Sequence, residues 1–310
     1  MYTAVDVVKH SNVGVAGSLG FWGQTAPGSL INSDDTLTAF GDKVLFSSCQ
    51  SAVAIDNQTQ LLVGYFYTGL NQSDTYSGLA YTNDGGETFG YSNWGIDTNP
   101  RYGAASESGW VITGGTWAAD SDVAVDGFKA FSQHFGAKIG EAGSNSLSLV
   151  RQPLRAFASS KNGYLGKIGF SPDQGKTWEL VFEDYDRFYF NGAHCFGNTC
   201  WAVAEGPWDA YIFKSADGGR TWAENAVFPG KSLMDIEFRS DLEGWAVGGT
   251  LFENTFEALF AHTTDGGVTW ETTETIANAY PNGITITESG VAYSSAFMRN
   301  GLSSLLAYHP

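Results

Sequence analysis

The segment Thr263-Thr264-Asp265-Gly266-Gly267-Val268-Thr269-Trp270 is one of four copies of an eight-residue pattern in this chain. The other copies occupy residues 82–89, 171–178 and 215–222, and all four fit the frame Ser/Thr-x-Asp-x-Gly-x-Thr-Trp/Phe. In such a segment we expect the Asp to accept hydrogen bonds from backbone N–H groups two residues on, while Gly adopts backbone conformations that other residues avoid. The final aromatic ring is apolar and is expected to be buried beside the turn. The pattern therefore predicts a tight turn between two antiparallel strands.

Two degenerate copies extend the series. Residues 33–40 keep Ser, Asp and the aromatic, and residues 132–139 keep Ser and Gly with His134 at the Asp position. The third positions of the six copies, at 35, 84, 134, 173, 217 and 265, are 39 to 50 residues apart. A period of this length is typical of a β-propeller, in which each repeat is one four-stranded sheet. We therefore predict an all-β propeller whose structural turn residues are Asp35, Asp84, Asp173, Asp217 and Asp265.

The segments before each turn repeat as well. The clearest unit comprises residues 235–238, 244–249 and 258–262, which we name strands A, B and C, with the turn between strands C and D. Two further units fit this template at the ends of the chain, over 4–8, 13–17 and 29–32, and over 283–287, 290–294 and 302–308. The last unit stops where its turn would begin. Six units with a turn and one without predict a seven-bladed propeller in a single domain, residues 1–310, with six blades as the alternative count.

Charge and hydropathy narrow the range of partners. The formal net charge is −17, which argues against nucleic acid and anionic membrane surfaces, since both require basic patches. No apolar run is long enough to span a membrane, so no membrane insertion is expected. A cationic or neutral ligand is compatible with this charge, and solubility alone is the simpler explanation of it. We expect a monomer.

Cysteine placement bears on the compartment. Cys195 and Cys200 flank a four-residue turn, and facing positions on antiparallel strands meet disulfide geometry. Such a bond suits an oxidising environment, as do the glycosylation sequons at Asn57 and Asn71. We therefore expect an extracellular or lumenal protein whose leader is absent from this sequence, with reduced cysteines in the cytosol as the alternative. Cys49, the third cysteine, has no predicted disulfide partner. No His or Cys pair has the spacing of a zinc site.

The eight-residue turns resemble those of the Asp-box, or BNR-repeat, propellers. That group includes sialidases, xyloglucan-cleaving glucanases, sortilin-type receptors and the photosystem II stability/assembly factors. The resemblance covers nearly the whole chain, and the element Gly-Trp-Ala-Val-Gly at 244–248 before its turn looks most like the assembly-factor branch. The motifs imply the fold and leave the activity open, since propellers carry many functions.

The sialidase signature is largely missing. That family grips a carboxylate with three arginines and has an Arg-Ile-Pro element near its N-terminus. No Arg precedes Arg101 here, and Arg-Ile-Pro does not occur. The related glucanases are much longer and place their cleft between two propellers. No catalytic set is therefore recognisable, and whether the protein is an enzyme stays open.

Aromatic residues follow strand B in nearly every unit. In propellers of this group the Asp-box turns lie on one face, and the B–C and D–A loops lie on the other, which is the usual ligand face. An aromatic-lined channel mouth there would stack on sugar faces, hold a flat apolar ligand or cage a cation, whereas packing between blades is the structural alternative. The predicted ligand-binding residues are Trp22, Tyr67, Trp117, Trp208, Phe252 and Phe297, together with Arg187 in a D–A loop.

Carboxylates accompany these aromatics. Two opposed carboxylates would serve as acid and base in glycoside chemistry, and acidic loops would also bind calcium. No pair is singled out by spacing, so the catalytic candidates remain weak: Asp120, Asp186, Glu205, Asp209 and Asp235. No cofactor and no metal site are predicted, with calcium as the cation to consider.

The sequence thus predicts a propeller that binds a glycan, a small molecule or a protein partner on its B–C/D–A face without catalysis. One alternative is a glycosidase or lyase that uses loop carboxylates. The other is an assembly-factor-like chaperone of a larger complex.

Overall fold

The computed structural model describes the strands and most turns of the second half of the chain, and the strands of the first half. The described residues are 2–7, 14–18, 26–31, 40–54, 60–67, 75–84, 88, 90–93, 99–106, 109–115, 129–131, 146–152, 165–171, 179–184, 187, 189–250, 257–287, 290–298 and 303–308. Within these ranges every regular element is a strand, which confirms the all-β prediction.

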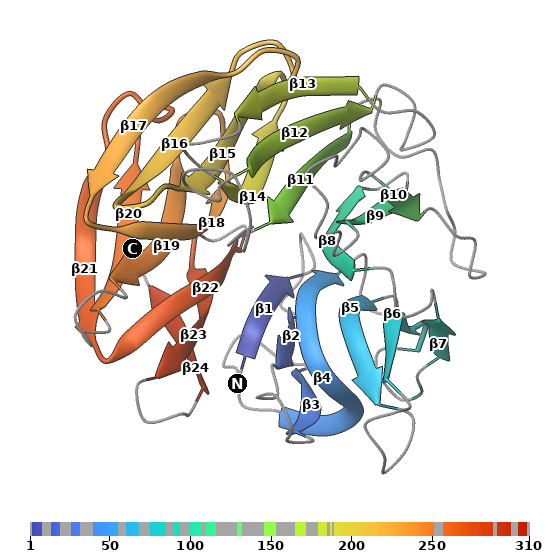
Figure 1. Ribbon diagram of the computed structural model, residues 1–310. Coiled ribbons are helices and arrows are strands. Elements are labelled where there is room, and N and C mark those ends of the chain that lie inside the picture. Colours follow the sequence, from blue (N-terminus) through green and yellow to red (C-terminus); the bar gives the residue numbers. More distant parts are fainter. Residues whose placement is uncertain are drawn as a thin grey trace.

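The described strands form seven antiparallel sheets that follow one another around a ring (Figure 1). The first sheet has β1 (Tyr2–Val7) and β2 (Gly14–Ser18), and the second has β3 (Ala26–Ile31), β4 (Phe40–Ala54), β5 (Gln60–Tyr67), β6 (Thr75–Thr82) and β7 (Gly90–Asn93). The third sheet has β8 (Asn99–Ser106), β9 (Gly109–Gly115) and β10 (Lys129–Phe131). The fourth sheet has β11 (Ser146–Gln152), β12 (Leu165–Ser171) and β13 (Glu179–Asp184).

Three further sheets complete the series. The fifth sheet has β14 (Tyr189–Phe196), β15 (Thr199–Glu205), β16 (Asp209–Ser215) and β17 (Ala223–Pro229). The sixth sheet has β18 (Ser232–Phe238), β19 (Gly244–Thr250), β20 (Glu257–Thr263) and β21 (Glu271–Ala277). The seventh sheet has β22 (Ala279–Ile286), β23 (Ala292–Met298) and β24 (Ser303–Tyr308).

The grouping of the N-terminal strands differs from the predicted first unit. The segment near residues 29–32 was expected to share a sheet with the two strands before it, but β3 is hydrogen-bonded to β4. The first half of β4 pairs with β3 and its second half pairs with β5, so Phe46 has partners on both sides. One continuous 15-residue strand thus joins what were expected to be two blades. Seven blades, with six as the alternative, stays a prediction.

The same irregularity recurs near the start of several sheets. A register shift of one residue interrupts the A–B pairing at Phe190/Gly192 in the fifth sheet, Leu233/Asp235 in the sixth and Pro281/Gly283 in the seventh. Such bulges bend a strand and increase its twist. Because the bulge has the same position in each of the three sheets, these sheets are repeats of one unit. Trp201, Trp245 and Tyr293 occupy equivalent positions in their B strands.

Apolar clusters lie between neighbouring sheets. Trp201, Ile212, Leu233 and Phe238 are buried between the fifth and sixth sheets, and Trp245 anchors the cluster between the sixth and seventh. Alternating residues of each B strand therefore face the two neighbouring sheets, as expected for strands buried on both sides.

Hydrogen bonds within the eight-residue pattern hold each described turn. Asp217 Oδ1 accepts from the Ser215 hydroxyl (2.7 Å) and the Thr221 N–H (2.9 Å), and Oδ2 accepts from the Thr221 hydroxyl (2.6 Å). The arrangement repeats around Asp84 and Asp265. The backbone donors lie three and four residues beyond the Asp, at Arg220 and Thr221, and not two as expected from an isolated Asp turn. The longer reach arises because the turn contains two residues with positive φ, Gly218 (73°) and Gly219 (92°).

These hydrogen bonds predict a pH dependence of stability. The Thr269 hydroxyl and N–H donate to ionised Asp265 and lower the pKa of that carboxyl to about 2; the Thr221 groups lower the pKa of Asp217 in the same way. Because the folded-state pKa lies below the ordinary value of 3.8, the stabilisation is complete above about pH 4 and is lost as the pH falls toward 2. We expect thermal melts followed by circular dichroism to show a smaller slope between pH 4 and pH 2 in Asp265→Asn than in the wild type. Parallel curves for the two proteins would contradict this.

The predicted disulfide is present. Cys195 and Cys200 are register partners at the end of β14 and the start of β15, and their sulfurs are bonded. The intervening turn uses Gly197 at φ 60°, and the Asn198 carbonyl accepts the Gly218 N–H at 2.7 Å. The cross-linked A–B turn is thereby attached to the Asp217 turn of the same sheet.

Candidate functional site

Two loops of the predicted ligand face meet at Gly206. The B–C loop 206–208 joins β15 to β16, and the Gly206 N–H donates to the Asp209 carbonyl at 2.8 Å. A Cβ atom on Gly206 would lie 2.9 Å from the Tyr211 ring and 3.0 Å from the Arg187 carbonyl, which belongs to the D–A loop between β13 and β14. The close approach of the two loops therefore requires glycine at this position.

Trp208 is presented outward from this junction. Its side chain is 73% exposed, although large aromatic residues are usually well buried. The Asp209 carboxylate, next in sequence, accepts the Gly230 N–H at 3.0 Å and so ties the loop to the turn between β17 and β18. Trp208 thus lies exposed on a loop whose backbone is held at both ends.

Arg187 lies beside this loop. Its Nε donates to Asp184 Oδ2 at 2.8 Å, and its backbone N–H donates to Oδ1 of the same carboxylate at 2.9 Å. The Arg187 side chain is still 65% exposed. We call the surface formed by Asp184, Arg187, Trp208, Asp209 and Tyr211 the loop patch.

Tyr211 supplies a hydroxyl group to the loop patch. Burial, and then the charges of Asp209 and Glu224, raise the pKa of Tyr211 above its ordinary value of 10.0, while Arg187 acts in the opposite direction. The phenol therefore keeps its proton at neutral pH. The loop patch combines a flat apolar ring, a guanidinium group and a hydroxyl group.

Glu205, a predicted catalytic candidate, ends β15 and is buried. The Tyr280 hydroxyl donates to Glu205 Oε1 at 3.4 Å and lies 2.5 Å from Ser232 Oγ. These three residues come from the fifth, sixth and seventh sheets. Tyr280 and Ser232 were not predicted, because neither belongs to a motif and the contact of Tyr280 with Glu205 joins residues 75 positions apart. The cluster links three sheets by polar contacts.

Asp235 was predicted to open an A strand, but it is the fourth residue of β18 and lies at the bulge. Its Oδ1 accepts the Ile236 N–H at 2.9 Å and its Oδ2 accepts the Ile284 N–H at 3.0 Å. Because β18 begins at Ser232, Asp235 lies within the strand, and its carboxylate connects β18 to β22. Gly192 makes room for it, since a Cβ there would lie 2.6 Å from Asp235 Oδ1.

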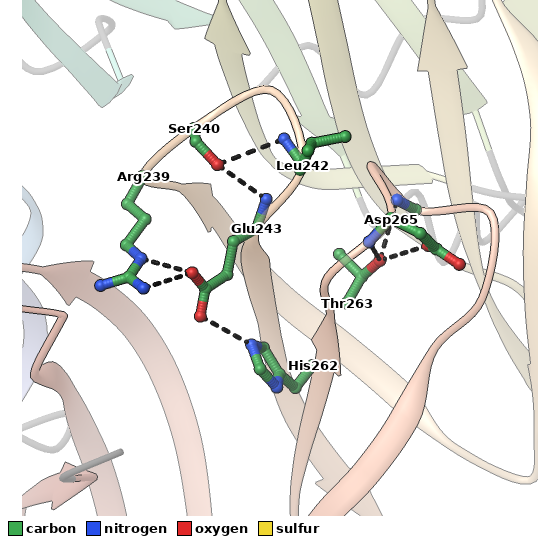
Figure 2. Close-up of polar contacts among 8 residues, drawn as sticks. Arg239, Ser240, Leu242, Glu243, His262, Thr263 and Asp265 are labelled. Atoms are coloured by element: carbon green, nitrogen blue, oxygen red, sulfur yellow. Dashed lines mark hydrogen bonds and ion pairs between the residues drawn. The ribbon is translucent and has the colours of Figure 1, made fainter.

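A second polar cluster lies at the opposite end of the sixth sheet and was not predicted. Figure 2 shows Arg239 and His262 directed at Glu243 from two sides, next to the turn that starts at Thr263. Arg239 Nε donates to Glu243 Oε2 at 2.6 Å, and His262 Nε2 lies 3.2 Å from Oε1. The cluster closes the A–B turn 239–243, where Ser240 also accepts the Leu242 and Glu243 N–H groups. The only signal in the sequence was the opposite charge of two residues four positions apart.

The remaining predicted site residues cannot be placed in this arrangement. Trp22, Trp117, Phe252, Asp120, Asp186, Asp35 and Asp173 lie outside the described residues, as do the sequon residues Asn57 and Asn71. Tyr67, Phe297 and Cys49 lie in described strands, but their side chains lie outside the description. The aromatic ring around the channel mouth therefore stays a prediction, with Trp208 as its described member.

The same described residues bear on metal binding and on membrane insertion. Among them, no group of three or more His, Cys, Asp or Glu side chains is arranged to hold a metal ion. None of the described segments is a helix of the length and hydropathy needed to cross a bilayer.

Comparisons with known proteins identify the fold. No protein-family model matches the chain, and no curated protein matches it. Among solved structures, the chain is similar to YCF48 from Cyanidioschyzon merolae, with a TM-score of 0.58 and 13% identity over 100% of this chain and 95% of that one. It is also similar to YCF48 bound to a D1 peptide, with a TM-score of 0.56 and 15% identity over 100% of this chain and 93% of that one. The β-propeller fold and the predicted likeness to the photosystem II assembly-factor branch are thereby confirmed at the level of structure.

Proposed function

We propose that the protein is a noncatalytic propeller that binds an extended segment of a partner protein on the loop patch. The observation that carries this proposal is Trp208, which is 73% exposed on a loop held by the Gly206 and Asp209 hydrogen bonds. Exposing an indole ring to water is unfavourable, and Trp, Tyr and Arg are the residues that dominate protein interfaces. All three types are present in the loop patch.

The described carboxylates favour binding over catalysis. Asp209 accepts the Gly230 N–H of a turn, Asp235 accepts the Ile284 N–H of a neighbouring strand, and Glu205 is buried against Tyr280. A general acid or base must reach the proton that it transfers, and these contacts direct the carboxylates toward the protein itself. A hydrolase or lyase would therefore have to draw its acid and base from other loops.

Charge and fold support the choice of a protein segment as the ligand. The net charge of −17 favours a segment that carries basic residues, because complementary charge speeds encounter and suppresses wrong partners. Similarity to YCF48, which has been captured with a D1 peptide, adds support for an assembly-factor-like role.

Trp208→Ala tests the proposal. Peptides selected from a random-sequence display library against the wild-type protein would be measured by fluorescence anisotropy. We expect Trp208→Ala to weaken the selected peptides about 30-fold, as for an interface hot spot, and Arg187→Ala to weaken them less.

Val268→Ala is the matched control, since Val268 is 72% exposed on an Asp-box turn at the opposite end of the strands. It is expected to leave peptide affinity unchanged. Equal effects of the two substitutions would contradict the proposal. Saturable, Trp208-dependent binding on a glycan array without peptide binding would assign the loop patch to sugars, and turnover of a bound glycan would assign it to an enzyme.

A further inference from the structure

The Cys195–Cys200 disulfide has one exposed end and one buried end. Cys195 is exposed at the end of β14, whereas Cys200 is fully buried at the start of β15. Phe196, which follows Cys195, is itself 44% exposed, and the turn residues Gly197 and Asn198 are exposed as well. A thiolate from solvent therefore reaches this disulfide at Cys195 and not at Cys200. Exposed disulfides are the ones that exchange most readily with other thiols.

As a cross-link, this disulfide constrains only a short loop. It joins residues five positions apart, and the stabilisation that a disulfide gives by restricting the unfolded chain is smallest for short loops. The strands on either side of it are paired in any case, His194 with Trp201 and Phe196 with Thr199. A disulfide that served stability alone would gain more by joining segments that are distant in the sequence.

The pair of residues next to the disulfide holds the sixth sheet. His194 Nδ1 accepts the Phe238 N–H at 3.2 Å, and the Trp201 Nε1–H donates to the Gly266 carbonyl at 3.1 Å. His194 and Trp201 are register partners, one residue inward from the two cysteines. We call these two hydrogen bonds the junction clasp. The junction clasp joins the end of β18 and the turn 263–270 of the sixth sheet to the fifth sheet.

The disulfide acts on the junction clasp through the backbone. Successive residues of a strand point to opposite faces of the sheet, so the two cysteines lie on the face opposite to His194 and Trp201. The disulfide fixes the spacing and register of β14 and β15 at the pair beside the clasp. Ladder positions close to an exposed turn open more easily than positions in the middle of a sheet. Breaking the disulfide is therefore expected to let His194 and Trp201 move relative to the sixth sheet.

We propose that Cys195 and Cys200 form a reversible exchange site for a small thiol such as glutathione, and that reduction of their disulfide loosens the junction clasp. The external thiolate attacks Cys195 Sγ and forms a mixed disulfide there, while the original S–S bond breaks and Cys200 leaves as a thiolate that takes up a proton. A second external thiolate attacks the outer sulfur of the mixed disulfide and releases Cys195, which is also protonated. The protein disulfide gains two electrons, and the two external thiols become one disulfide.

A redox titration of the full-length protein tests the exchange. The protein is equilibrated in buffers with graded ratios of reduced to oxidised glutathione, free thiols are blocked with iodoacetamide, and peptide mass spectrometry identifies the blocked cysteines. We expect Cys195 and Cys200 to become blocked together at one midpoint within the glutathione range, while circular dichroism shows a folded protein. A disulfide that persists in every buffer until the protein unfolds would overturn the proposal and leave the bond a purely structural cross-link.

Two variants test which sulfur is attacked. Cys200→Ser leaves the exposed thiol of the pair, and we expect oxidised glutathione to attach to Cys195 readily. Cys195→Ser leaves the buried thiol of the pair, and the reaction of Cys200 with oxidised glutathione is expected to be at least about tenfold slower, because thiol reactivity follows exposure. Circular dichroism checks that both variants are folded. Equal rates in the two folded variants would contradict the assignment of Cys195 as the attacked end.

Hydrogen exchange tests the consequence for the junction clasp. The Phe238 N–H, which donates to His194, is expected to exchange about tenfold faster in the reduced protein, as for the loss of one hydrogen bond. The Ile284 N–H, which donates to Asp235 between the sixth and seventh sheets, is the control and is expected to be unchanged. Unchanged exchange at Phe238, or equal acceleration at both amides, would overturn the link between the disulfide and the clasp. Both readouts are independent of peptide binding at the loop patch.

Discussion

Replacing Trp201 by alanine is expected to lower the free energy of unfolding by about 3–5 kcal/mol, the range for removing a fully buried aromatic side chain. The Trp201 ring is fully buried and stacks on Phe238 with 3.5 Å between centroids and 9° between planes. Its Nε1–H holds the Gly266 carbonyl of the next sheet's turn. The substitution would therefore open a cavity between the fifth and sixth sheets and remove a hydrogen bond across the same interface.

Equilibrium urea unfolding followed by far-ultraviolet circular dichroism would measure this loss without relying on tryptophan emission. Trp208→Ala is the matched control, because it deletes the same side chain at a site that is 73% exposed. It is expected to change stability by about 0.5 kcal/mol or less. Similar unfolding midpoints for the two variants would show that burial between the sheets is not the main contribution of Trp201.

Replacing Gly248 by alanine is expected to cost about 3 kcal/mol or more, at the upper end of the range for overpacking. A Cβ atom at Gly248 would lie 2.0 Å from the Ser232 carbonyl oxygen and 2.8 Å from the Leu233 Cα. Both neighbours are backbone atoms of β18, so no side chain can rotate to relieve the clash. The strand would have to move at the bulge that also positions Asp235.

Ala204 provides the reciprocal control for Gly248→Ala. It pairs with Phe190 at the bulge of the fifth sheet as Gly248 pairs with Leu233 in the sixth, and it is fully buried. Ala204→Gly is expected to cost about 1 kcal/mol, mainly through the greater backbone freedom of glycine in the unfolded chain. Thermal unfolding would compare the pair, and a Gly248→Ala protein as stable as Ala204→Gly would contradict the close approach of β18 and β19.

Several elements of the fold could be predicted because their causes are local. The Asp217 and Asp265 turns arise from hydrogen bonds among residues no more than four positions apart. The disulfide joins residues five positions apart across a two-residue turn. Strand positions near these turns followed from the same frame, and the structure places β20 and β24 within one residue of the segments expected.

Elements that depend on strand register could not be predicted. A bulge shifts every later side chain along the strand, and nothing in the residues 232–238 signals one. The position of Asp235, the joining of two expected blades through β4 and the pairing of β3 all depend on such registers. The candidate site could be predicted only in part. Trp208, Arg187 and Asp209 were named from their loop positions. Tyr211 and its close approach to Gly206 were not predicted.

The sequence by itself determined that this chain forms repeated strand pairs joined by the eight-residue turns, because each described turn is stabilised within its own eight residues. Only the tertiary structure decided which tryptophan is exposed, as Trp208 is, and which are buried, as Trp201 and Trp245 are. These roles depend on what the neighbouring sheet places against each ring. For Trp201 that neighbour includes Gly266, 65 positions away, whose approach follows from the packing of whole sheets and not from any local pattern.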